Sequence, residues 1–170
     1  QEILLSLTDD ILKKFNTSVP FDIEKIQAKY PVQYSESMNT VLVQECIRYN
    51  HLIKIIVQSC LDLQKAQQGL VVMSAAIETF STDLYNNQLP QQWLNVSYPS
   101  LKPIGSYIND LAQRLQFLHS WIKYGQPVVN WLSGIFFTHS FLTGVLQNYA
   151  RKYQIAIDTL EFHFHVHDKD

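Results

Sequence analysis

The chain has 170 residues, of which 46% are hydrophobic and 16% are charged, and its formal net charge at pH 7 is −2. The near-neutral charge, without a run of lysine and arginine, argues against nucleic acid or an anionic membrane surface as a partner. No apolar run reaches the roughly 18 residues that a membrane span requires. The charged fraction is below the usual value of about a quarter, which indicates that some apolar surface faces a partner.

Two short helices are predicted at the start of the chain. Between residues 3 and 15, apolar side chains recur at helical spacing: Leu4, Leu7, Ile11, Leu12 and Phe15. A second helix is predicted from Asp22, as the N-cap, to Lys29, because Pro31 disfavours helical geometry in the residue before it.

The strongest pattern predicts one long helix over about residues 35–68. Apolar residues alternate at spacings of four and three, and no glycine or proline interrupts the run before Gly69. Flanking apolar residues widen this stripe, which favours a strut buried in a helical assembly over a two-stranded coiled coil. The stripe consists of Leu42, Cys46, Tyr49, Ile53, Ile56, Cys60 and Leu63.

Three more segments follow. A helix is predicted over 73–84 with Ser74 as its cap, and the aromatic, proline-marked stretch 88–103 is expected to pack against helices. A second clean helix is predicted from about residue 106 until Gly125 and Pro127 stop it. A further helix is predicted over about 138–153, with its apolar side chains inward: Phe141, Leu142, Val145, Tyr149 and Tyr153.

The pattern changes at the end of the chain, where apolar residues alternate with polar ones over about 160–166. This period of two is typical of a β-strand. His163, His165 and His167 then lie on one face, roughly 7 Å apart, and could hold zinc or a related metal. A solvated strand face explains the same pattern more simply, so we predict no metal site. The fold is therefore predicted to be all-α, an irregular bundle with one long helix and this terminal strand.

No catalytic motif was found: the phosphate-binding loop, the nucleophile elbow, the His-Glu-x-x-His zinc motif and Cys-x-x-Cys are all absent. Cys46 and Cys60 lie 14 residues apart in the long helix, which separates them by about 21 Å and prevents a disulfide between them. Free thiols favour a reducing compartment. We predict no catalytic, cofactor or metal residue in this chain.

Several stretches resemble the C-terminal region of dynein heavy chains, in the expected order and over nearly the whole chain, from about Phe21 to Val166. They are SESMNTVLVQE (35–45), LQKAQQGLVVMS (63–74), SYPSLKP (97–103), WLSGIFFTHSFLTGVLQNYARKY (131–153) and IDTLEFHFHV (157–166). Among dynein heavy chains, these stretches most resemble those of the axonemal type. Ala156 replaces a proline that is frequent in the family, and the histidines of residues 163–167 replace acidic or neutral residues.

The resemblance implies a non-catalytic segment that follows the sixth AAA+ module and braces the ring of an ATP-driven, minus-end-directed microtubule motor. It implies one helical domain over 1–170, whose residues 1–30 join the preceding AAA+ lid and whose residues 157–170 begin a β region. Its partners would be AAA+ modules of the same heavy chain, with ATP and Mg²⁺ bound elsewhere in that chain. The parent motor would bind microtubules and other dynein chains in the cytoplasm, at the axoneme of a cilium or flagellum.

Two other functions remain open from the residues alone. One is an independent helical adaptor or a cytokine-like bundle, for which the glycosylation sequons at Asn16 and Asn95 would matter. The other is a metal-dependent protein built on the terminal histidines. Because the chain begins at Gln1 without methionine, we expect it to be part of a longer protein.

Overall fold

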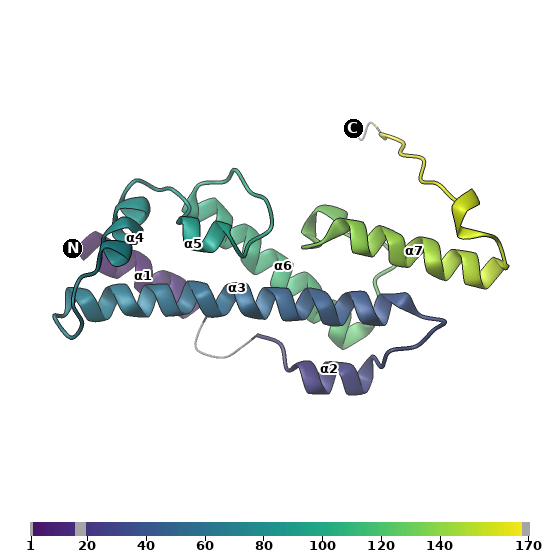
Figure 1. Cartoon of the computed structure of the whole chain (residues 1–170), viewed down its shortest axis with the longest axis horizontal. Coiled ribbons are helices and arrows are strands. Elements are labelled where there is room, and N and C mark those ends of the chain that lie inside the picture. Colours follow the sequence, from purple (N-terminus) through teal and green to yellow (C-terminus); the bar gives the residue numbers. More distant parts are fainter. Residues whose placement is uncertain (1, 16–19, 168–170) are drawn as a thin grey trace.

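In the computed structural model, residues 2–15 and 20–167 are described, and within them the chain is all-α, as predicted (Figure 1). The sequon at Asn16 lies outside the described residues. The helices are α1 (Glu2–Lys14), α2 (Ile23–Lys29), α3 (Ser37–Gln67), α4 (Ala75–Tyr85), α5 (Gln91–Leu94), α6 (Ile104–Tyr124) and α7 (Thr138–Tyr153), with short 3-10 turns at η1 (Leu132–Gly134) and η2 (Ile157–Thr159). None of the described helices is long and apolar enough to cross a membrane.

Helix α3 is the centre of the fold, and each of the other six described α-helices contacts it. Its 31 residues make it about 46 Å long at 1.5 Å per residue. The predicted apolar stripe is confirmed, since all seven of its members are buried. Figure 1 shows α3 along the length of the molecule, with α7 beside its N-terminal half and α1 and α4 near its C-terminal end.

Several helix ends agree with the sequence signals. The side chain of Asp22 accepts a hydrogen bond from the N–H of Lys25 and caps α2, and Ser74 caps α4 in the same way through the N–H of Ile77. After α3 the chain turns at Gly69, whose φ of +73° suits a residue without a side chain. The N–H of Leu70 then donates to the carbonyl of Lys65 and closes the helix end.

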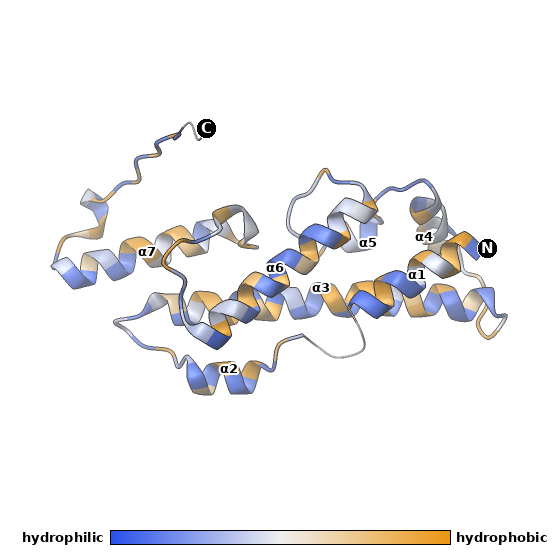
Figure 2. Ribbon diagram, turned by 180° about the vertical axis from the view of Figure 1, so that it is seen from behind, coloured by the Kyte–Doolittle hydropathy of each residue, from blue (hydrophilic) through white to orange (hydrophobic). Residues whose placement is uncertain are grey.

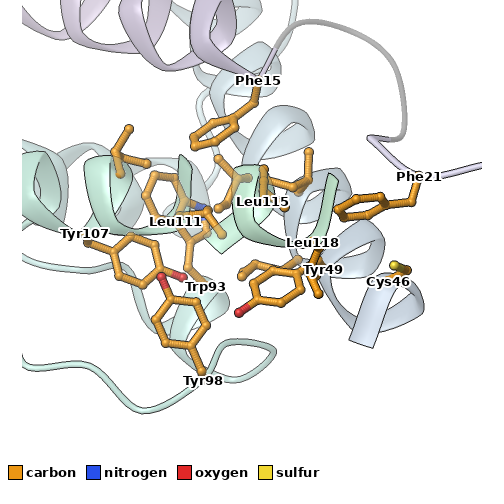
Figure 3. Close-up of a cluster of buried hydrophobic side chains, with 14 of the residues drawn as sticks. Phe15, Phe21, Cys46, Tyr49, Trp93, Tyr98, Tyr107, Leu111, Leu115 and Leu118 are labelled. Atoms are coloured by element: carbon orange, nitrogen blue, oxygen red, sulfur yellow. The ribbon is translucent and has the colours of Figure 1, made fainter. Parts of the chain in front are cut away.

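The proline-marked stretch packs on α3, as predicted. Trp93, on α5, is fully buried, and its indole N–H donates to the hydroxyl of Ser59 on α3 at 2.8 Å. Tyr98 is also buried and stacks on Tyr107 of α6, with 5.5 Å between the ring centroids. Figure 3 shows these aromatic side chains together with leucines of α6, so this stretch supplies part of the core between α3 and α6.

The segment around α2 is held at both ends by hydrogen bonds to other helices. Asn50 of α3 accepts from the backbone N–H of Phe21 and donates to its carbonyl, which fixes the entry to α2. At the exit, the hydroxyl of Tyr30 donates to the carbonyls of Trp121 and Ile122. Both carbonyls belong to the last turn of α6, where that of Trp121 also accepts from the N–H of Gly125, so Tyr30 adds a side-chain donor at this helix end.

Two expectations about the C-terminal part were wrong. On α7, Phe141 is buried, whereas Tyr149 and Tyr153 are about half exposed and lie against each other, with 4.4 Å between ring centroids. The β-strand over about 160–166 does not form, because a strand needs a neighbour for its backbone hydrogen bonds and the described residues provide none there. Residues 160–167 instead run away from the helices (Figure 1).

Candidate functional site

The most elaborate polar arrangement among the described residues joins the N-terminal half of α3 to α7. The two helices run antiparallel, because Ser37 at the start of α3 bonds to residues near the end of α7, while Glu45 bonds to residues just before α7. We refer to these two groups of contacts as the clasp. The clasp fixes the position of α7 relative to α3, and with it the position of the segment that follows α7.

The first end of the clasp is the carboxylate of Glu45, which is fully buried. Its two oxygens accept hydrogen bonds from the backbone N–H groups of Phe136 and Phe137, at 2.5 and 2.9 Å. Helix α7 has no side-chain cap of its own, so Glu45 supplies from α3 the negative charge that favours a helix N-terminus. Burial raises the pKa of Glu45, and these two N–H groups and the nearby Arg48 offset only part of that effect.

The second end of the clasp caps α3 in return. The side chain of Asn148 on α7 accepts from the N–H of Ser37 at 2.8 Å and donates to the carboxylate of Glu36 at 2.5 Å. The hydroxyl of Ser37 donates to Gln147 and accepts from the guanidinium of Arg151, both at 2.8 Å. Each helix therefore satisfies backbone groups at the N-terminus of the other.

Between the two ends of the clasp, α7 and α3 are in close contact at a glycine. Gly144 of α7 is buried, and a Cβ atom there would lie 2.4 Å from the end of the Met38 side chain and 3.2 Å from a methyl group of Val41. The absence of a side chain lets α7 approach α3 closely. Packing at this point and hydrogen bonds at the two ends together fix the register of the two helices.

A second buried polar centre holds the loops that lead into and out of α6. Asp110 of α6 accepts from the guanidinium of Arg114 and from the ammonium of Lys102, both at 2.7 Å. Burial opposes ionisation of Asp110, but these two partners outweigh it and lower its pKa. The Arg114 guanidinium also lies 3.7 Å from the centre of the Tyr98 ring and 5.7 Å from that of Trp131, which is cation–π geometry. The centre thus ties both loops to one helix.

A surface groove of about 640 Å³ follows the line between α3 and α7. Many of the lining residues carry a hydroxyl or an amide group, although the surface of the groove is mainly apolar. Arg151 contributes a positive charge, and its guanidinium lies 4.2 Å from the centre of the Tyr34 ring. None of the described residues that line it forms a nucleophile hydrogen-bonded to a base. Its walls are formed by Val32, Gln33, Tyr34, Ser37, Thr40, Val41, Gln44, Phe137, His139, Ser140, Thr143, Gly144, Gln147 and Arg151.

The side chains that the sequence offered for chemistry are not assembled into a site. Cys46 and Cys60 are both free and buried, and burial raises the pKa of each thiol to about 12, which suppresses their reactivity. His163, His165 and His167 lie on the exposed terminal segment. Among the described residues no three histidine, cysteine, aspartate or glutamate side chains are placed to hold a metal ion.

Sequence reasoning did not single out Glu45 or Asn148. Glu45 did carry a signal, because it is a charged residue on the buried side of the long helix, directly before Cys46. A carboxylate at such a position requires hydrogen-bond partners from another segment. Asn148 carried no such signal, since an amide in a partly polar helix is ordinary.

Comparison with known proteins gives a consistent result. The family model for the C-terminal domain of dynein heavy chains matches residues 1–170. The sequence is 55% identical over 166 residues to dynein axonemal heavy chain 1 of Rattus norvegicus, a match that covers 98% of this chain and 4% of the relative. It is 53% identical over 169 residues to dynein axonemal heavy chain 12 of Homo sapiens (99% and 5%) and 49% identical over 170 residues to dynein axonemal heavy chain 3 of Mus musculus (100% and 4%). The chain therefore spans only a small part of the length of these relatives.

Proposed function

The chain belongs to the family formed by the C-terminal domains of dynein heavy chains, and we propose that it acts within such a heavy chain as a rigid, non-catalytic brace on the AAA+ ring. The relatives named above are axonemal, which supports a place in a motor of ciliary or flagellar movement. The ATP hydrolysis and microtubule binding of that motor would belong to other parts of the same heavy chain. This domain would stiffen the AAA+ ring and keep its modules in position.

The observation that carries the proposal is the arrangement around α3. A helix about 46 Å long, buried along one continuous stripe and contacted by every other described α-helix, resists bending because bending would disturb many packed side chains at once. The clasp extends this stiffness to α7 by fixing it at two separated points. An element with few alternative conformations is what a ring needs to keep its modules in register.

The proposal also concerns how the domain continues in the heavy chain. Residues 1–30 would join the lid of the preceding AAA+ module, and residues 157–170 would begin a β region in which the terminal segment finds a neighbouring strand. The exposed apolar side chains of that segment, Phe164 and Val166, support this reading, because they alternate with histidines and lack cover from the described residues. Residues 168–170 of this range lie outside the described residues.

Cross-linking mass spectrometry on the full-length heavy chain tests the proposal. Four lysines are exposed on different parts of the domain and serve as probes: Lys54, Lys65, Lys102 and Lys123. Cross-links from them to AAA+ modules of the same heavy chain are expected. Links confined to the domain itself, or to unrelated proteins, would instead identify an independent helical adaptor. ATP turnover by the purified 170-residue protein would contradict the non-catalytic role.

A further inference from the structure

The loop between α3 and α4 exposes four consecutive apolar residues, Leu70, Val71, Val72 and Met73. Leu70 and Val72 are 71% and 85% exposed, which leaves most of each side chain in water. We call these four residues the tip. Figure 2 shows hydrophobic colouring in this loop at the far end of α3, at the edge of the molecule.

The tip is held in place at both of its ends. On one side, the N–H of Leu70 closes the end of α3 after the turn at Gly69. On the other side, Ser74 caps α4 through the N–H of Ile77. A loop anchored by two helix caps within six residues has little freedom, so the tip presents its apolar side chains in a fixed direction.

The composition of the tip favours a permanent partner. The stretch from Ala66 to Ile77 contains no charged residue, and such depletion of charge is typical of the core of an interface. The interfaces of permanent complexes are more apolar than those of transient complexes. A partner that is linked to the domain covalently would satisfy this condition, because a short connection gives it a high effective concentration.

The position of α1 indicates which part of the heavy chain is near the tip. Helix α1 contacts both α3 and α4, and Gln64, close to the end of α3, donates to the side chains of Thr8 and Asp9. Figure 1 shows the start of α1 at the same end of the molecule as the loop after α3. If the remainder of a heavy chain precedes residue 1, as the proposed function requires, it therefore joins this domain beside the tip.

We propose that the tip, Leu70–Met73, packs against the part of the heavy chain that immediately precedes residue 1. This inference rests on the proposed function. The contact would add a non-covalent attachment to the covalent one at the start of α1 and would prevent the long helix from rotating about that junction.

The test places a photo-reactive amino acid, p-benzoylphenylalanine, at position 72 of the full-length heavy chain. The matched control carries the same group at Val128, which is also a highly exposed valine but lies in the loop between α6 and α7. After irradiation, mass spectrometry identifies the residues captured from each position. Because both valines are exposed, neither substitution disturbs the core of the domain.

The expected result is capture, from position 72, of residues that precede this domain, at a yield several times that from position 128. Capture of another polypeptide or of a second heavy chain would overturn the inference, and so would equal yields from the two positions. The lysine cross-links separate the two proposals. If the lysine cross-links reach AAA+ modules but position 72 captures none of the preceding residues, the tip contact is wrong and the proposed brace remains. If the lysine cross-links do not reach AAA+ modules, the proposed brace is wrong.

Discussion

Replacing Glu45 with alanine tests whether the clasp holds α7 on α3. The substitution removes the acceptor for the N–H groups of Phe136 and Phe137, which then have no partner from α3. The site is partly buried, and each N–H left without an acceptor there costs up to about 1–3 kcal/mol. The cost of keeping a carboxylate out of water disappears at the same time, which offsets part of the loss. We expect the free energy of unfolding to fall by about 2–4 kcal/mol.

Urea denaturation followed by circular dichroism measures this change, and Glu78→Ala is the matched control. Glu78 is exposed on α4, so its replacement should alter the free energy of unfolding by less than about 0.5 kcal/mol. Hydrogen exchange locates the effect: amides of α7 should exchange faster in Glu45→Ala, with a smaller change in α1. Two results would refute the role of Glu45 as a cap for α7: a decrease in the free energy of unfolding of less than about 1 kcal/mol, or an equal increase in amide exchange rates across all helices.

The pH dependence of the stability of Glu45→Ala provides an independent test, because the direction in which the cost of the substitution changes with pH depends on the pKa of Glu45. Burial raises the pKa of Glu45 in the folded protein, so ionisation is less favourable there than in the unfolded state. The wild type therefore loses stability relative to Glu45→Ala as pH rises through the unfolded pKa towards the folded one. The measured cost of the substitution should be larger at pH about 4 than at pH about 7. A cost that increases with pH would mean that the N–H donors and Arg48 outweigh burial.

Three further predictions concern the core and the end of α3. Trp93→Ala should lower the free energy of unfolding by about 3–5 kcal/mol, measured in urea, because a fully buried indole and its hydrogen bond are lost. Cys46 and Cys60 should react with a thiol reagent at pH 8 only as fast as the protein opens, since both side chains are fully buried and burial also raises their pKa; rapid labelling of the native protein would contradict their burial. Gly69→Ala should destabilise by about 1 kcal/mol because of the positive φ, whereas Gly105→Ala, in α6 with open space around it, should not destabilise; equal effects in thermal melts would argue against the φ-based reasoning.

The helices were predictable from local signals, and the contacts between them were not. The stripe from Leu42 to Leu63 predicts α3 because the spacing of buried side chains is a property of the helix itself. Ser74 and Gly69 similarly mark helix ends through local geometry. The strand over about 160–166 was predicted wrongly, since alternation describes only one side of a pairing that needs a second strand.

The clasp illustrates what sequence alone could not provide. Glu45 and Phe137 are separated by 92 positions, and their hydrogen bond depends on α7 running antiparallel to α3. Tyr149 and Tyr153 were expected inward for a related reason: helical spacing identifies an apolar face but not whether another element covers it. The family resemblance, by contrast, was predictable, because long stretches in a fixed order are specific without any knowledge of contacts.

The central position of α3 has a consequence for how the protein folds during synthesis. Within this domain, helices α1 and α2 are synthesised before α3, the helix that both of them contact, and their buried side chains include Ile11 and Ile26. Until α3 has been synthesised, these side chains lack the helix against which they pack in the folded domain. Within this domain, synthesis of the segment up to residue 67 is therefore the interval in which a chaperone would be most needed, and a stall in translation there would favour aggregation over folding.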